Sequence, residues 1–166
     1  QQKGAELIRQ AGDQGDANMQ YVIGMMFDIK DGKLLPYEPA EAAYWYHEAA
    51  QQGHIKAQAE LARRYYVGYG VEQNYIEAAK WYNLPATTGD VLSQTSLGMI
   101  YSQGYGVKKD IIQAAYWFHK AAEQGDTRWL DWARGLGEMR SAAAALLGAE
   151  TGEIALVPNT TAGINL

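Results

Sequence analysis

Three histidines and scattered carboxylates are the residues of this 166-residue chain that could bind a metal ion or transfer protons. His47 and His119 stand 72 residues apart, with Asn83 midway between them. Neither histidine has a partner at metal-ligand spacing, and the sequence has no H-E-x-x-H motif. The carboxylates Glu38 and Glu41 stand where a helix is expected to begin, and the helix dipole accounts for them there. We therefore predict no catalytic residues, no metal site and no bound cofactor.

Glycine and cysteine usage exclude further kinds of chemistry. The Gly-Tyr-Gly segments at 68–70 and 104–106 lack the preceding strand, the third glycine and the lysine of phosphate-binding loops, so turns are expected there. The chain has no cysteine. This excludes disulfides, thiolate zinc sites, iron–sulfur clusters and a cysteine nucleophile.

Charge and hydropathy exclude two classes of partner. The chain carries 14 Lys and Arg against 19 Asp and Glu, a net charge of −5, so broad electrostatic binding of nucleic acid is not expected. No run of 18 apolar residues occurs, so membrane insertion is not expected either. The first ten residues lack a signal-peptide pattern and the chain starts at Gln1 without Met. A cytoplasmic location and export with a removed leader both stay open.

Tryptophan and glycine recur at a fixed interval, which predicts a repeat protein. The segments EAAYWYHEAAQQG at 41–53, EAAKWYNLPATTG at 77–89 and QAAYWFHKAAEQG at 113–125 superimpose with a period of 36 residues, and a Y-x-x-G-x-G-V pattern keeps the same period. The repeated residues are Trp45, Trp81, Trp117, Gly53, Gly89, Gly125, Gly68, Gly70, Gly104 and Gly106. Such a period is typical of solenoids, whose units bury their apolar faces only by stacking.

Each repeat is predicted to be a pair of helices. In the tryptophan segments, apolar residues stand three and four apart, as in a helix packed on one side, and the closing glycine suits the left-handed position after a helix. The following helix is expected over about 55–67 and again over 91–102. Aspartates are placed to cap these following helices. They are Asp16, Asp90 and Asp126.

The start of the chain is a degenerate copy of the repeat. It covers residues 3–16 and has Leu7 at the tryptophan position. The connection 28–39 replaces the short glycine turn of the later copies. Small residues in the following helices are expected where two helices cross closely. They are Gly24, Ala62 and Gly98.

Over residues 3–126, the two patterns together resemble the Sel1-like repeat family, a relative of tetratricopeptide repeats that is common in bacteria. The resemblance rests on Ala43, Trp45, Tyr46, Ala49, Ala50 and Gly53 and their copies. It implies an all-α, right-handed solenoid of antiparallel helix pairs, about three of them over residues 1–126. It also implies an adaptor or scaffold that holds a protein or peptide on its inner face, without catalysis.

The middle copy departs from the pattern, because Leu84-Pro85-Ala86 replaces the usual charged residue and two alanines. Proline inside a helix removes a hydrogen bond and clashes with the preceding turn, so we expect this helix to bend or to end early. Two consequences are open: a kink absorbed by packing, which we favour, and a reshaped groove.

The repeat stops after residue 126, and residues 127–166 form a different segment. An alanine-rich helix is expected from 130 to 147, and a short strand or a buried apolar run at 153–157. The tail at 128–166 resembles a fragment of class V aminotransferase-like, pyridoxal-phosphate enzymes. That resemblance places Thr160 and Thr161 at a cofactor-phosphate loop, but the Schiff-base lysine and most of the cofactor domain are missing. We interpret the tail as part of a fusion, chimera or fragment whose helix caps the last repeat.

Positions that vary between the tryptophan segments are the candidates for a partner-binding face, with ordinary solvated positions as the alternative. On the concave face we predict a ladder of Tyr44, His47, Lys80, Asn83, Tyr116 and His119. Two other functions stay open: a cofactor-linked role inherited through the tail, and a structural role in which the strand at 153–157 pairs between chains.

Overall fold

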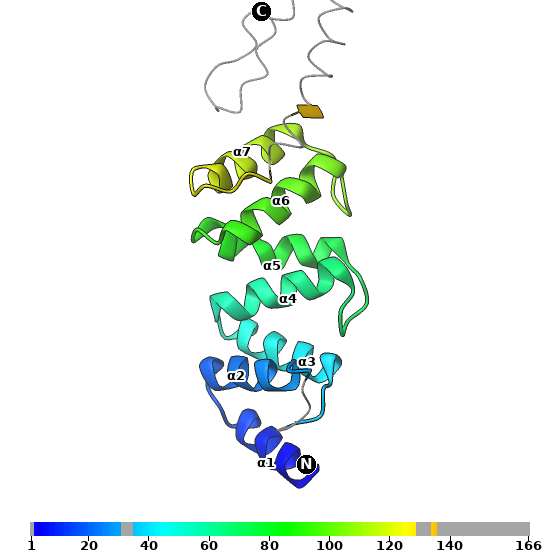
Figure 1. The fold of residues 1–166 in the computed structure, drawn as a ribbon, viewed down its shortest axis with the longest axis vertical. Coiled ribbons are helices and arrows are strands. Elements are labelled where there is room, and N and C mark those ends of the chain that lie inside the picture. The colour runs from blue at the N-terminus through cyan, green and yellow to red at the C-terminus, as the bar shows by residue number, and fades with distance from the viewer. Residues whose placement is uncertain (1, 31–34, 129–133, 136–166) are drawn as a thin grey trace, which may run out of the picture.

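The chain is a stack of α-helices arranged one after another along a single long axis (Figure 1). The computed structural model describes residues 2–30, 35–128 and 134–135. The helices are α1 (Gln2–Asp13), α2 (Ala17–Phe27), α3 (Pro39–Gln51), α4 (Ile55–Val67), α5 (Tyr75–Thr87), α6 (Val91–Gln103) and α7 (Ile111–Ala122). Among the described residues there is no strand, and the predicted all-α repeat solenoid is confirmed.

Neighbouring helices pack most extensively in three pairs: α2 with α3, α4 with α5, and α6 with α7. We call α2, α4 and α6 the leading helices, and α3, α5 and α7 the tryptophan helices. A Cβ atom on Gly24 would lie 2.9 Å from the Tyr46 ring, and one on Gly98 would lie 2.8 Å from the Phe118 ring. The prediction of close crossings at these small residues is therefore confirmed.

The ends of the helices follow from local chemistry. Gly53, Gly89 and Gly125 adopt positive φ angles after the tryptophan helices, as predicted. Asp16 accepts a hydrogen bond from the Met19 amide and caps α2. Asp90 does the same for α6, from the amide of Ser93 at 2.7 Å.

The cap of α4 is a histidine, which the sequence analysis missed. His54 Nδ1 accepts a hydrogen bond of 3.1 Å from the backbone N–H of Ala57. The imidazole also stacks on Tyr21, with ring centroids 4.5 Å apart. Burial, and then the charge of Lys56, lower the pKa of His54, which keeps the ring in the neutral form that can accept this bond.

The tryptophans fill the space between successive units. Trp45 is 1% exposed, and a Cβ atom on Gly12 of α1 would overlap its ring. Leu7, at the matching position of α1, is 59% exposed. In each copy, the side chain at the tryptophan position reaches toward the preceding unit. Among the described residues, no helix lies on that side of α1. Leu7 therefore matches the tryptophans in register but not in burial.

Pro85 lies inside α5 and is buried. Of the two outcomes expected from the sequence, a bend or an early end, the early end does not occur. The helix runs on to Thr87, the position that matches the end of α3 at Gln51. Proline stands here in the last turn, where it removes a single backbone donor. The Thr88 hydroxyl bonds to the carbonyl oxygens of Leu84 and Pro85 at 3.1 and 2.9 Å, which satisfies acceptors at the helix end.

A buried arginine holds the irregular connection between α2 and α3. Arg64 of α4 is 0% exposed, and its Nη2 lies 2.8 Å from Asp28 Oδ2. Its Nη1 donates to the carbonyl oxygens of Pro39 and Tyr69 at 3.1 and 3.3 Å. The guanidinium also lies over the Tyr46 and Tyr69 rings, 4.9 Å from each centroid. Both ends of the connection are thus tied to the next unit.

Candidate functional site

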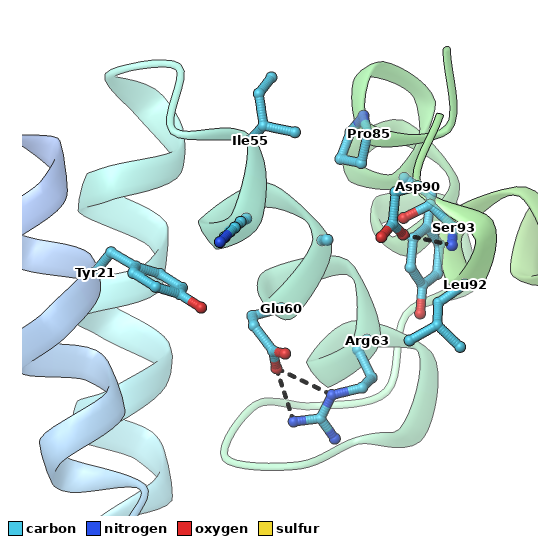
Figure 2. A pocket seen from close by; sticks show the side chains of 11 residues that line it. Tyr21, Ile55, Glu60, Arg63, Pro85, Asp90, Leu92 and Ser93 are labelled. Atoms are coloured by element: carbon cyan, nitrogen blue, oxygen red, sulfur yellow. Dashed lines mark hydrogen bonds and ion pairs between the residues drawn. The ribbon is translucent and has the colours of Figure 1, made fainter. Parts of the chain in front are cut away.

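A cavity of about 270 Å³ opens along the leading helices, and we call it the α4–α6 hollow (Figure 2). It lies between α4 and α6, with one side chain from α2 and two from α5. The lining residues are Tyr21, Ile55, Lys56, Ala59, Glu60, Arg63, Tyr82, Pro85, Asp90, Leu92 and Ser93.

The repeat explains why the hollow lies in the middle of the stack. In the first unit, Tyr21 stacks on His54 and fills the corresponding space. Ala59 and Asp90 stand at the matching positions one repeat later, and both line the hollow. One repeat further, the Thr95 hydroxyl of α6 donates a hydrogen bond to Asp126, which follows α7. The small side chain of Ala59 therefore leaves open a space that a tyrosine closes in the neighbouring unit.

The charged groups of the hollow are arranged along α4. Arg63 donates from Nε and Nη2 to Glu60 Oε2 at 3.0 and 2.8 Å (Figure 2). Lys56 stands one turn before this pair and is exposed. Across the hollow, Asp90 is engaged in capping α6. The wall thus offers two cations and two carboxylates, which suits hydrogen bonding to a polar chain better than capture of a strong anion.

The floor of the hollow carries two buried hydroxyl groups. The Ser93 side chain is 0% exposed, and its Oγ has no hydrogen-bond partner. Tyr82 is 4% exposed, and burial raises its pKa to about 12, although Ser96 and Arg63 act in the opposite direction. The phenol therefore stays protonated at neutral pH. A buried hydroxyl without a partner is costly, so Ser93 lowers the stability of the chain at the floor of the hollow.

Apolar side chains complete the hollow. Pro85 and Leu92 stand on the α5 and α6 side, and Ile55 stands on α4 (Figure 2). An apolar lining with a few polar groups is typical of sites that bind by shape and hydrogen bonding. Sequence comparison of the copies could have pointed to Ala59, since it is the small residue where the first copy has Tyr21.

The predicted ladder lies on the tryptophan helices, and none of its residues lines the hollow. Tyr44 and Tyr116 are 49% and 37% exposed, and each packs edge-on against its own tryptophan, with centroids 5.0 and 4.9 Å apart. Lys80 and Asn83 are exposed, with Lys80 paired to Glu77 at 2.6 Å. No observation brings these residues to one site, so the ladder stays a prediction.

The two ladder histidines make separate local contacts. His47 is half-buried, lies 3.4 Å from Glu48 and packs edge-on against Trp81. His119 is also half-buried and lies 3.4 Å from Glu123. Across the residues that the structure describes, no three His, Cys, Asp or Glu side chains gather as a metal site would require.

Several predictions concern residues outside the described part of the chain. They are the helix from 130 to 147, the strand at 153–157 and the cofactor-loop residues Thr160 and Thr161. Among the helices that are described, none is long and apolar enough to span a bilayer.

Comparison with known proteins places these features in a family. A family model described as Sel1 repeat matches residues 19–54, 55–84 and 91–126. These matches pair each leading helix with the tryptophan helix that follows it, as the packing does.

Two solved structures resemble the chain along most of its length. One is a protective antigen present in uropathogenic Escherichia coli strains, displaying an SLR fold: it is 36% identical with a TM-score of 0.67, and the match covers 83% of this chain and 28% of that one. The other is a Sel1 repeat protein from Oxalobacter formigenes, 34% identical with a TM-score of 0.65, covering 74% and 49%. The chain therefore spans less than half the length of either protein.

Proposed function

Because the chain belongs to the Sel1 repeat family, whose members generally mediate protein–protein interaction, we propose that it is a non-catalytic adaptor that binds a peptide segment of a partner protein in the α4–α6 hollow. One observation carries the proposal: Ala59 and Asp90 leave a space that Tyr21 and His54 fill in the first unit. The lining of apolar side chains beside charged groups on α4 supports the same conclusion.

The substitution Ala59→Tyr tests this proposal, because the chain itself shows that a tyrosine fits at the matching position of α2. We expect this variant to keep its melting temperature and to lose at least tenfold in peptide affinity, a difference of about 1.4 kcal/mol or more. A phage-displayed library of random 12-residue peptides supplies the probes, and fluorescence anisotropy measures their dissociation constants.

Ala40→Tyr is the matched control, since Ala40 is exposed on α3 and lies outside the hollow. It should leave the affinity unchanged. If selected peptides bind the Ala59→Tyr variant as tightly as the unchanged chain, the hollow is not the binding site.

The ladder is a second candidate surface, favoured by the identical edge-on packing of Tyr44 and Tyr116 on their tryptophans. Tyrosines held in this way offer contact area at little entropic cost. The double substitution Tyr44→Ala and Tyr116→Ala separates the two surfaces. Loss of affinity in this variant alone would move the site to the tryptophan helices.

A further inference from the structure

An arginine occupies the space that corresponds to the α4–α6 hollow one repeat later. Thr95 and Asp126 stand there at the positions of Ala59 and Asp90. The guanidinium of Arg128 joins them: its Nε donates to both carboxylate oxygens of Asp126 at 2.9 Å, and its Nη2 donates to the Thr95 hydroxyl at 3.3 Å. The third unit therefore places a guanidinium where the second unit leaves the hollow open.

The Asp126–Arg128 pair shows what a carboxylate at this position can bind. The hydrogen bond from Arg128 holds the pKa of Asp126 well below its ordinary value, although burial acts in the opposite direction. The same carboxylate accepts the backbone N–H of Arg128 at 2.9 Å. It thus binds a backbone amide and a guanidinium together, as the several lone pairs of a carboxylate allow.

Asp90 has the carboxylate of this arrangement without the cation. The residue that matches Arg128 in the second unit is Leu92, which is 59% exposed and has no polar group on its side chain. Asp90 accepts the Ser93 amide through Oδ2 at 2.7 Å, and the described residues form no ion pair with it. A carboxylate that faces the hollow is therefore available to a cation from outside the chain.

The two cations on the opposite wall do not prevent a third from binding. Arg63 is paired with Glu60 across the hollow from Asp90 (Figure 2). Lys56 is exposed, so water and salt screen its charge. The net charge of −5 on the chain favours a basic peptide at longer range.

We infer that the α4–α6 hollow binds an arginine side chain of the partner peptide, whose guanidinium pairs with Asp90 as Arg128 pairs with Asp126. This inference rests on the proposed function, because the arginine belongs to the peptide that the hollow binds. Arginine suits the site better than lysine, since its planar fork directs several donors to one carboxylate.

Peptides from the random 12-residue library test the inference. We expect arginine to be enriched among the selected peptides whose binding Ala59→Tyr weakens. Replacing that arginine by citrulline, which has the same shape without the charge, should weaken binding about tenfold in fluorescence anisotropy. In an Asp90→Asn variant the arginine and citrulline peptides should bind equally, and asparagine keeps the cap of α6. Asp16→Asn is the matched control, because Asp16 caps α2 and lies outside the hollow.

A second experiment needs no peptide. Leu92→Arg gives the second unit an arginine at the position of Arg128, and Leu92→Gln is its uncharged control. We expect the melting temperature of Leu92→Arg to exceed that of Leu92→Gln by about 2 °C. Asp90→Asn should remove this difference. Leu92→Arg should also weaken the binding of arginine peptides, because its own guanidinium competes for Asp90.

The outcomes separate this inference from the proposed function. If peptides sensitive to Ala59→Tyr bind equally with arginine and citrulline, the arginine site is wrong and the proposed function stands. If no selected peptide is sensitive to Ala59→Tyr, the proposed function fails and the inference fails with it. Equal melting temperatures of Leu92→Arg and Leu92→Gln would show that a guanidinium does not pair with Asp90, whatever the peptides do.

Discussion

Arg64 is a fully buried cation with a single carboxylate partner, so its effect on stability depends on that partner. Removing a charge from water costs several kcal/mol. For Arg64 this desolvation cost is offset by interactions with Asp28, two carbonyl oxygens and two aromatic rings. At the matching position of α6 stands Ile100, which is also 0% exposed. The fold therefore accepts an apolar side chain here where no irregular connection has to be held.

The substitution Arg64→Met should lower the free energy of unfolding by about 3–5 kcal/mol, because it leaves Asp28 partly buried without a counter-charge. Adding Asp28→Asn to Arg64→Met should recover part of the lost stability. Urea denaturation of the single and the double variant measures their free energies of unfolding. Arg63→Met is the control, since the exposed Arg63–Glu60 pair should contribute less than about 1 kcal/mol. Equal effects of the two methionine substitutions would contradict this account.

His54 makes the stability of the chain depend on pH. Its pKa is lowered in the folded state, first by burial and then by Lys56. The unfolded chain therefore takes up a proton more readily, and stability falls as the pH drops below about 6.5 toward the folded pKa. Above about pH 6.5 the stabilisation that neutral His54 gives the folded chain is fully present.

The substitution His54→Asn should remove this dependence, because asparagine caps helices without titrating. The difference in melting temperature between the variant and the unchanged chain should widen in favour of the variant as the pH is lowered from 7 to 5. A difference that stays constant over this range would show that protonation of His54 is not coupled to folding.

The same residues show where prediction from sequence reached its limit. The caps Asp16 and Asp90 were predicted because aspartate recurs at the repeat interval. His54 and Arg64 were missed because they depart from their copies: His54 replaces an aspartate, and Arg64 replaces an apolar residue, Met26 or Ile100. Comparison of copies identifies what the copies share, whereas both of these side chains serve one unit alone.

At the scale of helices, each tryptophan helix depends on the unit before it. Trp45 is buried against α1, and its indole N–H donates to Glu41 at 3.0 Å. The helix bounds expected from the pattern, about 55–67 and 91–102, agree with α4 and α6 to within one residue. The α4–α6 hollow was not predicted from the sequence, because it depends on which side chains meet between units.

The substitution Trp45→Ala should cost about 3–5 kcal/mol of stability, since it empties the space between α1 and α3. Leu7→Ala, at the same register position of α1, should cost less than about 0.5 kcal/mol because the side chain is already exposed. Thermal and urea unfolding of the two variants compare them directly. A large loss from Leu7→Ala would mean that this face of α1 is covered in solution.

At the scale of the whole molecule, the α4–α6 hollow and the ladder lie mainly on different helices of the stack. The helices α4 and α6, which line most of the α4–α6 hollow, lie in the middle part of the stack (Figure 1), whereas the ladder follows α3, α5 and α7. In a solenoid each unit contacts only its neighbours. A substitution in the hollow is therefore expected to leave the units beyond its immediate neighbours unchanged.

The pairing of each leading helix with the next helix along the chain also governs how the protein acquires its structure. Nearly all packing joins elements that are adjacent in sequence, so only short loops have to close before apolar surface is buried. Proteins with such local contacts fold rapidly. Each helix pair can therefore pack onto the unit before it as soon as its own residues have left the ribosome, without waiting for the units that follow.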